Sequence, residues 1–117
     1  LTPDFVIDWL YKKVQKQINK VNEIGKNFNY FTPFESIFEK AEKAKQVISL
    51  GTQFGEGWLI SGEILSFASQ GVNHVISLQP FGCIANHIVE KGIEKRIKSL
   101  CPQMNILSLD LTVASAM

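Results

Sequence analysis

The stretch that decides the fold is Val72-Asn73-His74-Val75-Ile76-Ser77-Leu78, together with Gln79-Pro80-Phe81-Gly82-Cys83 after it and Asn105-Ile106-Leu107-Ser108-Leu109 further on. The first and last of these runs are rich in aliphatic residues, which is typical of short buried strands. Between them, one face of a helix is indicated by Ile84, Ile88, Ile93, Ile97 and Leu100. A strand, a helix and a strand predict a βαβ unit, in which the strands are parallel and the crossover is right-handed.

A two-stranded parallel sheet is too small to stand alone. Parallel sheets are normally covered by helices on both faces. We therefore expect a helix-rich α/β fold in which the βαβ unit forms part of a small Rossmann-like, three-layer domain. Further strands must come from the tail around Leu111 to Val113, from another copy, or from chain outside this sequence.

Two helices are expected in the first half of the chain before residue 52. Thr2-Pro3-Asp4 begins the first, with Thr2 as its N-cap, and Gly25 ends it as a left-handed C-cap. Thr32-Pro33-Phe34-Glu35 predicts a capping box for the second, which ends at Gly51. Both carry an apolar stripe, so each needs a surface to pack on.

A third helix is expected from about Trp58 to Gln70, closed by Gly71. Gly62 inside this apolar helix indicates close backbone packing. The whole chain is expected to form one α/β domain over residues 1–117. It comprises an amphipathic helix and link over 1–31, and helices plus the βαβ unit over 32–117.

Composition narrows the class of protein. With 117 residues and 45% hydrophobic side chains, the chain can bury one core. Lys and Arg number 12 against 11 Asp and Glu, which argues against nucleic acid or an anionic membrane as partner. Two cysteines suit a reducing compartment, and neither a membrane span nor a signal peptide is evident, so a cytoplasmic location is expected. The start at Leu1, directly at a helix cap, predicts a piece of a longer chain.

The candidate site lies where ligands gather in open α/β sheets, at the carboxyl ends of the strands. Gly82-Cys83 places a thiol at a helix N-terminus, which favours a thiolate and hence metal ligation or nucleophilic reactivity. The alternative is that Cys83 is a small buried hydrophobe. Asn86 and His87 follow one turn later on the same face, where they can donate to a cluster, a phosphate or an acyl group, or simply form an exposed polar turn.

The remaining candidates are weaker. Cys101 lies about 27 Å from Cys83 if the helix is straight, so the two cannot form a disulfide or ligate one cluster together. Glu56 and Glu63 are an acid/base pair or a cation site, or else a capping acid and a surface acid. His74 is interpreted as structural or solvated. No phosphate-binding glycine loop, zinc signature or serine-nucleophile motif is present in the sequence.

The sequence from about Phe34 to Asp110 resembles a stretch of large fused proteins, the CoA-substrate-specific activases or activators related to (R)-2-hydroxyglutaryl-CoA dehydratase. Three blocks and a shorter segment carry the resemblance: Gly51-Thr52-Gln53-Phe54-Gly55-Glu56-Gly57-Trp58-Leu59-Ile60-Ser61-Gly62-Glu63, Gly71-Val72-Asn73, Gln79-Pro80-Phe81-Gly82-Cys83-Ile84-Ala85-Asn86-His87, and Gly92-Ile93-Glu94-Lys95. The third block is the most specific. Asp110-Leu111-Thr112-Val113-Ala114-Ser115 departs from the acidic, glycine-containing turn usual in the family.

This resemblance implies an oxygen-sensitive [4Fe–4S] system of anaerobic metabolism. There an ATP-hydrolysing activator drives one electron into a dehydratase, which removes water from a 2-hydroxyacyl-CoA. It implies Cys83 as an iron ligand, Asn86 and His87 as supporting residues around it, and an ATPase module and a CoA-thioester dehydratase as partners. The ATPase motifs of the activator are absent, so the chain is not expected to bind ATP and is expected to be inactive alone. Because it offers one candidate thiolate, it is also expected to hold no stable cluster by itself. The alternative is a non-catalytic docking or assembly module of the same large protein.

Overall fold

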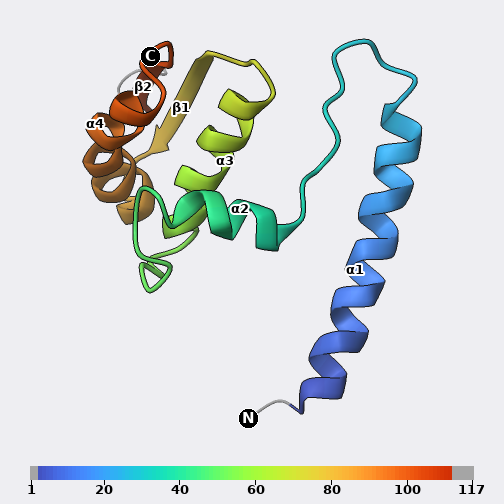
Figure 1. The fold of residues 1–117 in the computed structure, drawn as a ribbon. Helices are drawn as coiled ribbons and strands as arrows, with labels where there is room; N and C mark the ends of the chain where they lie inside the picture. Colours follow the sequence, from blue (N-terminus) through green and yellow to red (C-terminus); the bar gives the residue numbers. More distant parts are fainter. Residues whose placement is uncertain (1–2, 112–117) are drawn as a thin grey trace. The chain divides into compact units, whose positions relative to one another are not determined.

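The computed structural model describes residues 3–111, and the chain divides into two compact units with the boundary between Phe34 and Glu35. The first unit consists of helix α1 (Asp4–Gly25) and the segment that follows it (Figure 1). Pro3 is the N-cap of α1, whereas the expected cap, Thr2, lies outside the described residues. The apolar stripe of α1 is exposed at Ile7, Leu10, Val14, Val21 and Ile24.

The predicted left-handed cap at Gly25 is wrong. Gly25 is the last helical residue and has no positive φ, and the chain turns after Lys26. The reason for a glycine here is space, since a Cβ atom would lie 2.3 Å from the ring of Phe31. Phe31 therefore packs directly on the helix backbone, and its own ring contacts Phe34 edge to face.

The second unit begins with helix α2 (Ile37–Ala44), four residues later than the expected capping box. The box is formed by Ser36 and Glu39: the Ser36 hydroxyl accepts from the Phe38 amide, and the Glu39 carboxylate accepts from the Ser36 amide. The helix also ends before Gly51, and residues 45–51 form turns. Glu35 is unavailable for capping because it accepts hydrogen bonds from Lys43 and Ser66.

Helix α3 (Gly57–Ser69) agrees with its prediction and packs on α2. Gly71 has a φ of 82°, the left-handed conformation expected of a helix-ending glycine. A Cβ atom at Gly62 would lie 2.7 Å from the carbonyl oxygen of Lys40, so the expected close backbone approach is confirmed.

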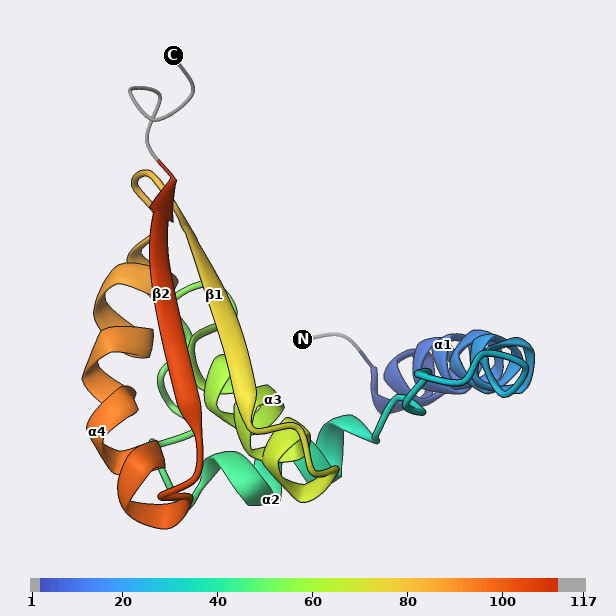
Figure 2. The ribbon, with the colours of Figure 1, turned by 90° about the horizontal axis from the view of Figure 1, so that it is seen from above.

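The βαβ unit is confirmed. Strand β1 (His74–Pro80) pairs in parallel with β2 (Asn105–Leu111), with Ser77 opposite Ser108. Between them runs a π-helical turn, η1 (Ala85–Glu90), which continues into α4 (Lys91–Leu100) (Figure 2). Residues 112 and 113, where a further strand was considered, lie outside the described residues.

The core of the second unit lies between one face of the sheet and the helices α3, η1 and α4. Its buried side chains are Ile64, Val89, Ile93, Ile97 and Met104. The opposite face of the sheet is apolar and exposed, with Ile76, Leu78, Leu107, Leu109 and Leu111 between 40% and 63% accessible. Within residues 35–111, helices therefore cover one of the two faces that a parallel sheet normally buries.

Candidate functional site

The turn after β1 presents the candidate thiol. β1 runs two residues further than expected, to Pro80, and the chain then reverses through Phe81, Gly82 and Cys83. Gly82 has a φ of 79°, which residues with a side chain rarely adopt, and the Cys83 amide donates to the Pro80 carbonyl at 3.1 Å. The glycine therefore allows the tight turn that places Cys83 at the carboxyl end of the sheet.

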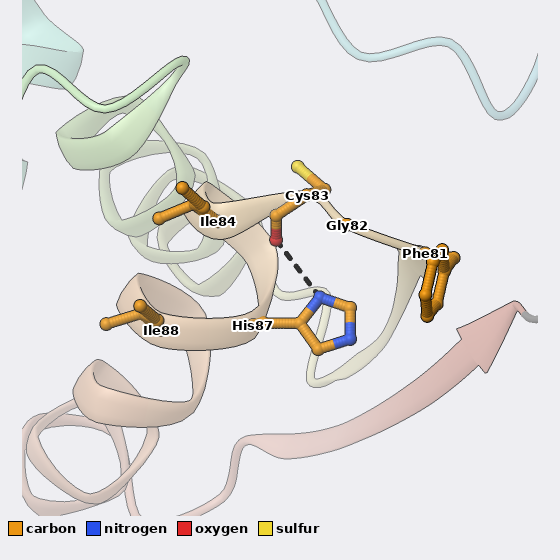
Figure 3. A pocket seen from close by; sticks show the side chains of 6 residues that line it. All are labelled: Phe81, Gly82, Cys83, Ile84, His87 and Ile88. Atoms are coloured by element: carbon orange, nitrogen blue, oxygen red, sulfur yellow. Dashed lines mark hydrogen bonds between the residues drawn. The ribbon is translucent and has the colours of Figure 1, made fainter.

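Cys83 lies in a shallow, mainly apolar pocket of about 250 Å³ (Figure 3). Its thiol is free and partly exposed. Phe81, Ile84 and Ile88 line the pocket and are 81%, 57% and 66% exposed. Exposed apolar side chains therefore surround this thiol.

His87 lies beside this pocket, and each of its ring nitrogens lies near an oxygen atom. Nδ1 lies 3.0 Å from the carbonyl oxygen of Cys83, and because that oxygen can only accept, we infer that Nδ1 carries a hydrogen. Nε2 lies 3.4 Å from Oδ1 of Asp110, and the other carboxylate oxygen of Asp110, Oδ2, lies 3.6 Å from Lys91 Nζ. The sulfur of Cys83 points away from the ring (Figure 3), so these residues do not form a cysteine–histidine nucleophile pair.

Asn86 faces a different element from His87. Its amide nitrogen donates to the carbonyl oxygen of Leu78 at 3.1 Å, which ties η1 to β1. The structure thus brings Cys83 and His87 to one pocket and directs Asn86 to the strand.

The two cysteines lie at opposite ends of the helical segment, as expected. Cys83 precedes η1, while Cys101 is the C-cap of α4 and packs against the core. Among residues 3–111, no group of three or more His, Cys, Asp or Glu side chains is arranged to hold a metal ion.

Glu63 and His74 lie at the surface, whereas the capping role considered for Glu56 is wrong. Glu56 is at the N-cap position of α3 without a capping hydrogen bond, and Glu63 pairs with Lys40 at 3.0 Å. Both line a groove of about 230 Å³ beside β1. His74 is exposed, and its Nδ1 lies 3.4 Å from the side-chain amide of Asn105.

A buried carboxylate was not expected from the sequence. Glu90 is 1% exposed and accepts hydrogen bonds from Ser77, from Ser108 at 2.8 Å and from the Gln79 side chain at 2.9 Å. The other amide atom of Gln79, Oε1, is buried and has no partner within the described part of the chain. The sequence did contain a signal for this cluster: Ser77 and Ser108 occupy strand positions that point towards the core, where a hydroxyl needs a hydrogen-bond partner.

No protein-family model, curated protein or solved structure matches this chain. No helix within residues 3–111 is long and apolar enough to cross a membrane.

Proposed function

We propose that this chain is part of a larger, cytoplasmic iron–sulfur protein of the 2-hydroxyacyl-CoA dehydratase type, related to the CoA-substrate-specific activases. In this proposal, the Glu35–Leu111 region presents Cys83 as one ligand of a [4Fe–4S] cluster that accepts or passes on an electron. The remaining ligands come from other domains of the parent or from its dehydratase partner. ATP hydrolysis belongs to a separate activator module.

One observation carries this proposal. Cys83 is a partly exposed thiol at the carboxyl end of two parallel strands, in an apolar pocket. Thiolates are the usual ligands of [4Fe–4S] clusters, and an apolar surround limits the access of water to the iron. The Cys83 thiol can bind one iron of a cluster, and the described residues offer no second thiol at this site.

His87 and Asn86 have supporting roles in this proposal. His87 donates to the Cys83 carbonyl through Nδ1, which fixes the turn that carries the thiol, and its Nε2 approaches Asp110. Asn86 anchors the following helical turn to β1. Neither side chain needs to touch the cluster, because both position the segment that presents Cys83.

The proposal is tested in the full-length parent, purified without oxygen, by measuring its iron and acid-labile sulfide. Cys83→Ser is expected to lower the cluster content, since one thiolate is lost. Cys101→Ser is the matched control and should leave it unchanged, because Cys101 packs against the core. Unchanged cluster content in Cys83→Ser would rule out the ligand assignment.

The second candidate is a non-catalytic docking module within the same parent. It is favoured by the exposed apolar face of the sheet, which forms a continuous patch and not a scatter of single apolar side chains. The patch consists of Ile76, Leu78, Leu107, Leu109 and Leu111. Replacing Ile76 and Leu107 by threonine should then disrupt assembly of the parent while leaving its iron content per assembled complex unchanged. A loss of cluster content with assembly intact would contradict this role.

A further inference from the structure

Within residues 3–111, β1 pairs with β2 along one edge, and no strand pairs with its other edge. The Asn105 amide donates to the Asn73 carbonyl at 2.7 Å, and the Phe81 amide donates to the Leu111 carbonyl at 3.2 Å. In a parallel ladder, alternate residues bond to the neighbouring strand, so the backbone groups of His74, Ile76 and Leu78 point away from β2. These three residues form the free edge of β1.

Only one end of this edge is protected. Pro80 has no amide hydrogen to offer, and the Leu78 carbonyl is already occupied by Asn86. The remaining length, at His74 and Ile76, carries neither a lysine nor a proline, which commonly block an edge. A pairing segment can therefore bond along His74–Leu78 and must end before Pro80.

A groove lies beside this edge. Helix α3 is on the side of β1 away from β2 (Figures 1 and 2), and Ile60, Ile64 and Phe67 of α3 line the groove together with Val75 and Ile76. Phe67 is 41% exposed although it is a large aromatic residue. A strand added to β1 would place alternate side chains on these residues and cover them.

The groove is acidic. Glu56 and Glu63 are the charged residues that line it, and no lysine or arginine does so. Glu63 pairs with Lys40, but Glu56 has no ion-pair partner within residues 3–111. A strand that enters the groove is therefore expected to bring a cation.

Topology shows where such a strand belongs. Helices α3 and α4 pack on the same face of the sheet, around Ile64 and Ile97. Strand–helix–strand crossovers are right-handed, so successive strands whose connecting helices lie on one face are added in one direction across the sheet. β2 follows α4 on one side of β1, and a parallel strand preceding α3 would therefore lie on the other side, at the free edge of β1. Within residues 35–111, α3 is instead preceded by α2 and by turns.

We propose that the free edge of β1, His74–Leu78, binds an extended strand of a partner polypeptide. The strand directs apolar side chains towards α3 and a lysine or arginine towards Glu56 and Glu63. A second copy of β1 is a poor occupant, because His74–Pro80 contains no lysine or arginine. The proposal does not depend on Cys83 or on a cluster, so the two can fail separately.

In the test, a displayed library of nine-residue peptides is selected for binding to the whole chain. The selected peptides are then synthesised, and hydrogen exchange of the chain's backbone amides is measured by NMR with and without each peptide. Selected peptides are expected to alternate apolar residues and to contain lysine or arginine. Their binding should slow exchange of the Ile76 and Leu78 amides roughly tenfold or more. Peptides N-methylated on their backbone should lose binding, since a strand needs its amides.

Two variants test the groove. Glu56→Gln should weaken the selected peptides several-fold, as should Phe67→Ala, provided its amide spectrum shows an intact fold. Glu94→Gln is the matched control, since it removes a carboxylate that pairs with Lys98 on α4. The proposal is overturned if no peptide is selected, if selected peptides are acidic, or if they bind without protecting Ile76 and Leu78. Concentration-dependent protection without peptide would identify a second copy as the occupant and would also overturn it.

Discussion

At the scale of single residues, the Glu35 carboxylate links α2 to α3, because it accepts hydrogen bonds from Lys43 of α2 and Ser66 of α3. Burial alone would raise its pKa, but hydrogen bonds from Lys43 and Ser66, the charge of Lys43, and the Gln70 amide together hold the pKa of Glu35 below its ordinary value of 4.5. The folded carboxyl therefore binds its proton less readily than the unfolded one. Its contribution to stability is present above the ordinary pKa and is lost as the pH falls through the lowered one.

Glu35→Gln is accordingly expected to lower the free energy of unfolding near neutral pH by about 1–2 kcal/mol. Below the ordinary pKa of Glu35, the difference between the variant and the original chain should shrink. Urea denaturation at a series of pH values measures both effects. Glu42→Gln is the control, because the exposed Glu42–Lys45 pair should contribute less than about 1 kcal/mol. A constant difference at all pH values would contradict the assigned role of Glu35.

The two thiols are expected to differ in reactivity. Both cysteines are partly exposed and line open pockets, but Cys101 also packs against the core at the end of α4, whereas Cys83 lies beside the exposed Phe81. Iodoacetamide near neutral pH should therefore label Cys83 first, as peptide mapping would reveal. If Cys101 reacts first, or if neither thiol reacts before unfolding, Cys83 is a core residue and the docking function is favoured.

Residue-scale chemistry was only partly predictable. Glycine before a cysteine, at the end of an aliphatic run, correctly indicated a thiol at the mouth of the sheet. The polar cluster of Glu90 was missed, because a glutamate in a helix is usually solvated. Its burial depends on the π-helical turn and on Ser77 and Ser108, which lie 31 residues apart in the sequence but opposite each other in the sheet.

At the scale of elements, the packing of α2 on α3 depends on Gly62. A Cβ atom there would lie 2.7 Å from a backbone oxygen of Lys40, and a backbone atom cannot move aside cheaply. Gly62→Ala is expected to cost about 1–3 kcal/mol in the free energy of unfolding. Gly92 of α4 has open space around it, so Gly92→Ala should stabilise the chain by about 0.5–1 kcal/mol. Equal effects in thermal or urea denaturation would show that the close contact is not significant.

Elements were predictable where local pattern and tertiary contacts agree. The aliphatic runs located both strands, and Gly71 ended α3 as expected. The predicted start of α2 was wrong because Thr32 and Ser36 are each followed three residues later by a glutamate. The sequence offers two equivalent capping boxes, and the choice depends on Lys43 and Ser66, which engage Glu35 from positions further along the chain.

At the scale of the whole molecule, the described residues leave two apolar surfaces exposed and place one thiol at the proposed cluster site. The outer face of the sheet and the rim around Cys83 are both exposed. A [4Fe–4S] centre is generally held by about four thiolates, and this chain has two cysteines at opposite ends of one helical segment. Both features agree with the proposal that other polypeptide completes the site.

The chain on its own is therefore expected to retain no stable cluster after anaerobic reconstitution with iron and sulfide. The two cysteines lie at opposite ends of the helical segment, so a cluster at Cys83 would gain one protein thiol, and the small ligands at its other irons would be removed on desalting. Iron and acid-labile sulfide, measured after desalting, should fall well below the roughly four of each per chain that a full cluster requires. A stable cluster would contradict this expectation for the isolated chain. Measuring the mass in solution would then decide whether several copies share one cluster through Cys83, and Cys83→Ser would abolish it only in that case.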